Sequence, residues 1–162
     1  FLDSDDIWKK NKLKIQLKFM KKKKANFSFS SYKIINEQDA IIGHRKAQEV
    51  LTYEKLIYSC DLGLSTVVLK KSILKKKMMF PDLKTKEDYV LWLLLAKNKI
   101  KLYGLSKSLV YWRETNNSLS SNTIQKLIDG FRVYNKYLKF NLIKSIIHLT
   151  ILSVNFIIKK NK

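Results

Sequence analysis

The chain opens on Phe1-Leu2-Asp3-Ser4-Asp5-Asp6-Ile7-Trp8, in which an apolar pair is followed at once by three carboxylates. The apolar pair is typical of the end of a buried strand, and the acidic residues are typical of the loop that follows one. Ligands bind at the carboxyl ends of strands in open α/β sheets, so this loop is the first candidate site. Asp5 or Asp6 is also placed to cap a following helix.

Regular elements are predicted on the carboxyl side of this stretch. Leu13, Leu17 and Met20 recur at i, i+4 and i+7 and predict a helix that ends in the lysine run 21–24, where cations complement the helix dipole. Aromatic residues alternate with serines over residues 25–35 and predict a strand. Residues 36–39 then form a turn, and residues 40–58 are only weakly patterned.

The second half of the chain contains one strongly apolar helix. Residues 89–96 are apolar on all sides, which is typical of a buried helix, and Thr85 with Asp88 has the T-x-x-D form of a cap. The other predicted elements are a strand at 62–69, a helical turn at 72–74, strands at 100–103 and 109–113, a polar loop at 114–121 and a helix at 123–140.

Composition limits the class of protein. The 162 residues are 46% hydrophobic and 28% charged, which suits one folded domain or part of a larger one. Cys60 is the lone cysteine, so a disulfide framework is excluded, and with His44 and His148 it has no zinc-ligand spacing. A reducing cytoplasm is the expected compartment. The chain opens on Phe1 without a leader pattern, so we expect the natural start to be missing.

Charge narrows the class of partner. Lys and Arg number 33 against 13 Asp and Glu, a net charge of +20, which suits nucleic acid or an anionic membrane surface. The arginines are only Arg45, Arg113 and Arg132, whereas readers of bases and phosphates favour the bidentate guanidinium. We therefore expect no nucleic-acid partner.

The tail at 138–162 differs from the rest of the chain. Residues 145–158 are uncharged apart from His148 and are flanked by lysines. At about 1.5 Å per residue the stretch reaches about 21 Å, short of a hydrocarbon core of about 30 Å. Two interpretations stay open: a helix at the interface of an anionic membrane, or a core helix covered by residues outside this chain.

Each carboxylate motif allows two interpretations. Asp3-x-Asp5 is either an Asp-rich turn with a cap, or a pair of oxygen ligands that hold Mg²⁺ or Mn²⁺ against a diphosphate. Glu87-Asp88 either complements the dipole of its helix or supplies a general base. A helix amino end lowers carboxylate pKa values, so an Asp base there is expected to be weak.

Four motifs in series resemble family 2 glycosyltransferases, in the order of that family and over residues 1–137. They are Phe1-Leu2-Asp3-Ser4-Asp5-Asp6-Ile7-Trp8, Gly63-Leu64-Ser65-Thr66-Val67-Val68-Leu69-Lys70-Lys71, Glu87-Asp88-Tyr89-Val90-Leu91-Trp92 and Asn117-Ser118-Leu119-Ser120-Ser121-Asn122. The resemblance is to bacterial enzymes that assemble capsule, lipopolysaccharide or other surface glycans. It implies a GT-A fold with a mainly parallel sheet flanked by helices, and inverting transfer from a nucleotide-sugar donor to a glycan or lipid-linked acceptor. It also implies a location at the cytoplasmic face of the plasma membrane.

The resemblance also implies roles for individual residues. Asp5 would coordinate the divalent metal, and Asp3 would support the site through ribose or metal-bound water. Asp88 would be the general base, with Glu87 orienting the site or the acceptor. The remaining implied contacts are Asp3, Asp6, Arg113 and Ser118 for the donor, and Gly63, Ser65, Thr66 and Trp92 for the acceptor.

Two departures from the family's pattern qualify these expectations. Many relatives have a His two positions after the Arg, and this chain has Thr115. The first half of the nucleotide-binding unit is also absent, so we expect an amino-terminally incomplete domain at 1–137 that is inactive alone. The other functions considered are a basic module that binds a membrane surface or nucleic acid, and an inactive truncated remnant.

Overall fold

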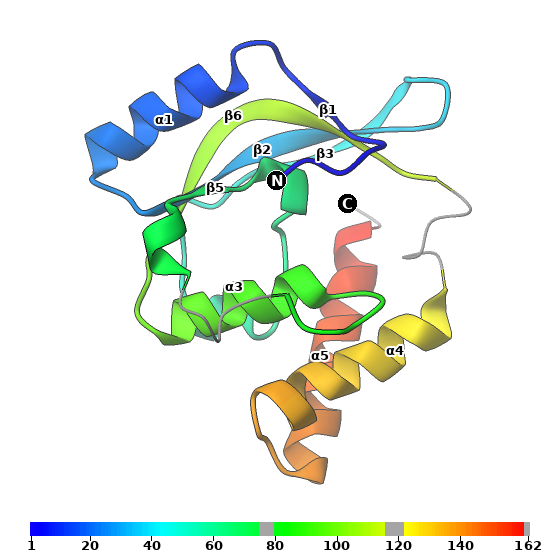
Figure 1. The fold of residues 1–162 in the computed structure, drawn as a ribbon. Helices are drawn as coiled ribbons and strands as arrows, with labels where there is room; N and C mark the ends of the chain where they lie inside the picture. The colour runs from blue at the N-terminus through cyan, green and yellow to red at the C-terminus, as the bar shows by residue number, and fades with distance from the viewer. Residues whose placement is uncertain (75–79, 116–121, 161–162) are drawn as a thin grey trace.

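A computed structural model describes residues 1–74, 80–115 and 122–160 as a mixed β-sheet with helices on both faces (Figure 1). The strands are β1 (Ile7–Trp8), β2 (Phe27–Ile35), β3 (Ile41–Arg45), β4 (Val50–Leu51), β5 (Val68–Leu69) and β6 (Leu102–Arg113). The helices are α1 (Lys12–Lys23), α2 (Tyr53–Leu56), α3 (Glu87–Lys97), α4 (Thr123–Arg132) and α5 (Leu142–Lys160). Shorter turns are 3-10 helices at Leu64–Thr66 and Lys71–Ile73 and a π-helix at Val133–Tyr137.

The sheet is mixed, so the prediction of a mainly parallel sheet was wrong in that detail. Among the described strands, β2 and β6 pair in parallel at the centre, and every other pairing is antiparallel. Parallel neighbours need a long crossover, and the chain between β2 and β6 supplies one that includes α3. The other strands are short, and they pair in antiparallel fashion at the edges and ends of this central pair.

The core lies between the sheet and α3. Figure 1 shows α1 on one side of the sheet and α3 on the other. Trp92 of α3 is fully buried and meets Phe27 of β2 edge to face, with 5.2 Å between ring centroids. The apolar sequence of this helix correctly predicted its burial, because it shares one core with β2 of the sheet, with the segment around α2 and with the π-helical turn at Val133–Tyr137.

α1 ends in the predicted lysine run but buries a different face. Leu13 and Leu17 are 45% and 54% exposed, whereas Lys12, Gln16 and Met20 are buried. Lys12 Nζ donates to Gln16 Oε1 at 2.9 Å, and Gln16 Nε2 donates to the Thr66 carbonyl at 2.9 Å. This polar pair fixes which face packs inward, because buried donors and acceptors must be satisfied.

Several predicted boundaries near the acidic loop were wrong. Phe1 and Leu2 are not in a strand and are 38% and 51% exposed, since no described strand pairs with them. Asp5 and Asp6 do not cap α1: its amino-terminal cap position is Asn11, because β1 intervenes between the acidic loop and the helix.

Farther along the chain, only the end of the strand predicted at 62–69 forms, as β5, and a 3-10 turn replaces its first part. The two short strands predicted at 100–103 and 109–113 are one continuous strand, β6. Gly104, Leu105 and Ser108 pair with β2 between the two predicted pieces, and a register shift leaves Ser106 and Lys107 as a bulge within the continuous strand. The helix predicted at 123–140 is α4 followed by the π-helical turn.

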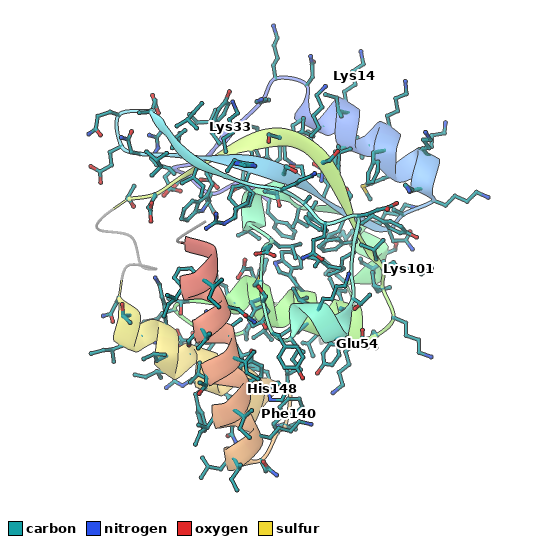
Figure 2. The ribbon with its side chains drawn as sticks, turned by 180° about the vertical axis from the view of Figure 1, so that it is seen from behind. Lys14, Lys33, Glu54, Lys101, Phe140 and His148 are labelled. Carbon is teal, nitrogen blue, oxygen red and sulfur yellow. The ribbon has the colours of Figure 1, made fainter. Side chains whose placement is uncertain are left out.

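α5 packs against the rest of the chain through one face. His148 is buried beside Tyr58, Tyr134 and Phe140, with ring centroids 5.0 to 5.4 Å apart. Figure 2 shows Phe140 and His148 side by side at this contact. Within the described ranges, no helix has the length and apolarity needed to cross a membrane.

Candidate active site

Three segments meet at one place in the fold: the acidic loop, the segment around Ser65 and the first turns of α3. The ring of Phe1 lies edge to face with Trp92, with 5.9 Å between centroids. The Asp3 backbone N–H donates to Ser65 Oγ at 2.9 Å, and Trp8 Nε1 donates to the Ser65 carbonyl at 2.8 Å. Residues that the sequence separates by more than sixty positions therefore share one site.

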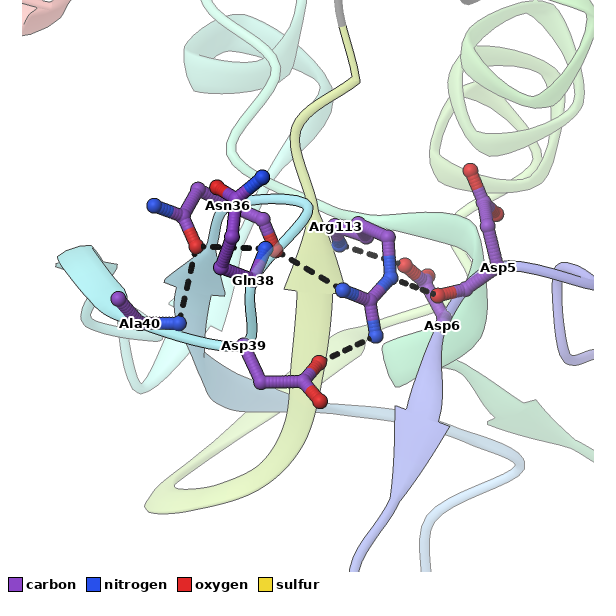
Figure 3. Close-up of polar contacts among 7 residues, drawn as sticks. All are labelled: Asp5, Asp6, Asn36, Gln38, Asp39, Ala40 and Arg113. Carbon is purple, nitrogen blue, oxygen red and sulfur yellow. Dashed lines mark hydrogen bonds and ion pairs between the residues drawn. The ribbon is translucent and has the colours of Figure 1, made fainter.

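Arg113 binds the acidic loop to the hairpin between β2 and β3 (Figure 3). Its Nε donates to the Asp5 carbonyl at 3.0 Å, its Nη1 to the Asn36 carbonyl at 2.8 Å and its Nη2 to Asp39 Oδ1 at 2.6 Å. The backbone N–H of Arg113 donates to Asp6 Oδ1 at 2.9 Å. Arg113 thus holds the backbone of this loop while the Asp5 side chain stays exposed.

Carboxylates of the acidic loop lie in a partly buried, electronegative setting. Burial raises the pKa of Asp3, and the charge of Asp5 raises it further. Burial also raises the pKa of Asp6, against the opposing effects of Ser65 and of the Arg113 backbone N–H. A divalent cation would relieve this crowding of negative charge.

Glu87 and Asp88 form the first turn of α3 and face the same region. Burial raises the pKa of Asp88 to about 6, and the charge of Glu87 adds to this, while the Tyr89 N–H, Lys86 and Trp92 oppose it. Burial also raises the pKa of Glu87, as do the charges of Asp3 and Asp129. The expected lowering by the helix amino end was wrong, because burial outweighs the helix dipole here.

The carboxylates of the loop can be compared with what a divalent cation needs. Among the described residues, no three His, Cys, Asp or Glu side chains group so as to hold a metal ion by themselves. Mg²⁺ commonly uses one or two protein carboxylates and takes its remaining ligands from water and phosphate. The oxygen ligands of Asp3 and Asp5 fit that pattern.

The structure places the other predicted site residues as follows. Ser65 and Thr66 are buried against the acidic loop and α1, and the Thr66 hydroxyl donates to the Gly63 carbonyl at 2.6 Å. Trp92 is in the core beneath Asp88. Ser118 lies outside the described residues. Contacts of these residues with a donor or an acceptor stay predictions.

Two carboxylates near the site were missed by the sequence analysis. Asp39 holds Arg113, and Asp129 of α4 is fully buried and accepts from Thr85, the residue expected to cap α3. α3 has no side-chain cap, so that expectation was wrong. One signal for Asp129 existed: it is the only acidic residue in 122–162, where every other charge is a cation.

Comparison of the sequence with known proteins identifies bacterial relatives. The chain is 40% identical over 128 residues to the UDP-Glc:alpha-D-GlcNAc-diphosphoundecaprenol beta-1,3-glucosyltransferase WfgD of Escherichia coli, an alignment that covers 78% of this chain and 49% of WfgD. It is 33% identical over 146 residues to the putative teichuronic acid biosynthesis glycosyltransferase TuaG of Bacillus subtilis, which covers 90% of this chain and 58% of TuaG. The chain therefore spans about half the length of these relatives. No protein-family model matches it.

The fold is also found in a solved structure. The crystal structure of S. aureus TarS 1-349 in complex with UDP-GlcNAc superposes with a TM-score of 0.61 at 22% identity, covering 85% of this chain and 40% of TarS. At this level of identity the match concerns the fold.

Proposed function

We propose that this chain, which is homologous over most of its length to family 2-type glycosyltransferases, carries the transfer site of a bacterial enzyme that builds surface polysaccharide. The reaction is the transfer of a sugar from a nucleotide-diphosphate donor to a hydroxyl of a glycan or lipid-linked acceptor. The observation that carries the proposal is the convergence of the Asp3–Asp5 loop with Glu87 and Asp88 on a GT-A-type sheet.

Asp88 is the proposed general base. With a pKa of about 6, it is mostly ionised at neutral pH and yet more basic than an ordinary Asp. It accepts the proton of the acceptor hydroxyl as the new bond forms on the face of the sugar opposite the departing diphosphate, which gives inversion. Glu87 keeps a second carboxylate beside Asp88 and orients the acceptor.

Asp5 and Asp3 are the proposed ligands of a divalent cation, Mn²⁺ or Mg²⁺. When bound, such a cation neutralises negative charge on the departing nucleoside diphosphate. Arg113 fixes the backbone of Asp5, so the Asp5 carboxylate is presented from a rigid loop. Asp6 maintains this arrangement by accepting from the Arg113 backbone, and Ser65 supports Asp3.

The proposed donor is a UDP-sugar and the proposed acceptor a diphospholipid-linked sugar, by analogy with the printed activity of WfgD. We further propose that the enzyme works at the cytoplasmic face of the plasma membrane. One face of α5 supports this: its outward side chains include Ile143, Ile147, Val154 and Ile157, each 48 to 71% exposed. The region 122–162 carries cations and a single acid, Asp129, which is buried.

Transfer assays with matched variants test the proposal. Because the chain spans about half of WfgD, the assay uses the chain alone and a fusion of the chain with the part of WfgD that lies outside the alignment, with UDP-glucose and a GlcNAc-diphospholipid. Asp88→Asn should lower the transfer rate by about 10²–10⁴-fold while UDP-sugar affinity stays unchanged. Glu87→Gln should cost less.

The outcomes distinguish the functions under consideration. An Asp88→Asn fusion within a few-fold of wild type would contradict the assignment of the base. A wild-type fusion that binds no UDP-sugar and transfers none would favour the inactive remnant. Sedimentation of the chain with anionic vesicles, without donor binding by the fusion, would favour the basic surface module.

A further inference from the structure

We propose that Asp129 is a positioning residue for Glu87 and Asp88, and that it acts from α4 through Thr85. The inference rests on the proposed function, since it assigns a task to a residue that does not reach the reacting atoms. By this inference, α4 helps to position the residues of the transfer site.

The contact between Asp129 and Thr85 is buried, and the Asp129 carboxylate accepts four hydrogen bonds. Asp129 Oδ2 accepts from the Thr85 backbone N–H and from Thr85 Oγ1, each at 3.0 Å. The same oxygen accepts from Gln125 Nε2 at 2.9 Å, and Arg132 Nη1 donates to Oδ1 at 3.3 Å. A side chain with no exposed surface that accepts from a segment 44 residues away fixes the position of that segment.

The segment it fixes leads directly into the catalytic turn. Lys86 follows Thr85 and occupies the amino-terminal cap position of α3. Its φ of 64° is a left-handed backbone conformation, which is unfavourable for residues other than glycine. No side chain caps α3. A strained turn persists when its surroundings hold it in place, and the contact with Asp129 holds Thr85, the residue before the strained Lys86.

The side chain of Lys86 also packs against α4. A Cβ atom added at Gly130 would lie 3.4 Å from Lys86 Cε and 2.7 Å from Leu149 Cδ1. The Lys86 stem therefore lies against α4 at Gly130, the residue next to Asp129. The turn is thus in contact with α4 at both Thr85 and Lys86.

The surroundings of Asp88 depend on this turn. The charged and titratable groups that act on it are Glu87 and Lys86 from its own turn and Cys60 from the segment after α2. If the turn loosens, water reaches Asp88 and the carboxylate moves relative to the acceptor hydroxyl. Small displacements of a catalytic group cost large factors in rate.

Substitutions at Thr85 give a matched test. Thr85→Val keeps the shape but removes the hydroxyl donor, and Thr85→Ser keeps the donor. Asp129→Asn keeps the packing but removes the charge. The measurements are kcat and donor KM of the WfgD fusion, the titration of the Asp88 carboxyl by ¹³C NMR, and circular dichroism to monitor folding.

We expect Thr85→Val and Asp129→Asn to lower kcat by about tenfold or more with donor KM within about twofold. The Asp88 titration midpoint should fall from about 6 toward its ordinary value of 3.8. Thr85→Ser should retain wild-type behaviour. If Thr85→Val does not fold, Asp129→Asn decides the question.

The inference is overturned if folded variants keep the wild-type kcat and the wild-type Asp88 titration. It is also overturned if kcat, donor KM and the unfolding temperature change together in Thr85→Ser as much as in Thr85→Val. If the wild-type fusion transfers no sugar, the proposed function fails, while the NMR titration still decides whether Asp129 positions Asp88.

Discussion

Asp88 should destabilise the folded protein at neutral pH, and its removal should therefore stabilise the fold while abolishing transfer. Its pKa rises from 3.8 in the unfolded chain to about 6 in the folded one, because the carboxylate loses water on folding. Each pKa unit corresponds to 1.36 kcal/mol, so ionised Asp88 costs about 3 kcal/mol. In the wild type the Tyr89 N–H donates to Asp88 Oδ1 at 2.6 Å. Asp88→Asn removes the cost of the charge and keeps an oxygen that can accept this hydrogen bond.

The effect has a defined pH window. A group whose folded pKa is raised stabilises the fold fully below the unfolded value and loses that contribution as the pH rises through the folded value. The Asp88 contribution to wild-type stability should thus fall between about pH 4 and pH 6 and then level off. The Asn of Asp88→Asn does not ionise, so the variant does not lose this stability, and the two proteins should differ most above pH 6 and least near pH 4.

Urea unfolding from pH 4 to pH 8 measures the difference between the two proteins. Glu54→Gln is the control, because Glu54 is also an acid in the first turn of a helix but is fully exposed and has a lowered pKa. Its substitution should not stabilise the protein at pH 7. An Asp88→Asn protein no more stable than wild type at pH 7, or a difference independent of pH, would refute burial as the cause.

Three further results are expected. Asp5→Asn should abolish the metal-dependent part of UDP-sugar binding in a calorimetric titration with Mn²⁺, and an unchanged metal dependence would move the ligand to Asp3. Arg113→Lys should lower stability to urea by about 1–3 kcal/mol, because an ammonium cannot bridge the acidic loop and the hairpin as a guanidinium does; equal stability would contradict this. Ile147→Glu should weaken sedimentation with anionic vesicles more than Leu17→Glu, which places the same charge on exposed α1, and equal losses would exclude α5 as the membrane surface.

Much of the candidate site could be predicted from local sequence. The acidic loop, the Ser65 segment and the Glu87–Asp88 pair are short motifs, and their resemblance in series to motifs of family 2 glycosyltransferases predicted that they belong to one site. α3 was also predictable, because a helix that is apolar all round has to be buried. These signals are local, since each lies within a few residues.

The fold was less predictable where long-range pairing decides it. The two predicted pieces of β6 are one strand because Gly104, Leu105 and Ser108 between them pair with β2, while Ser106 and Lys107 form a bulge that carries no local strand signal. Gln16 lies outside the apolar repeat of Leu13, Leu17 and Met20, and it is buried where its amide donates to the carbonyl of Thr66.

What the sequence determined by itself is the inventory of the site and the order of its parts, since residue type and spacing are written in the chain. Only the tertiary structure decided which of those residues act on one another. Burial raises the pKa of Asp88 at a helix end that would otherwise lower it, and Arg113 binds the loop that holds Asp5. Asp129 meets Thr85 across 44 residues. Such effects depend on distances and solvent exclusion that arise when remote segments pack together, and no local pattern encodes them.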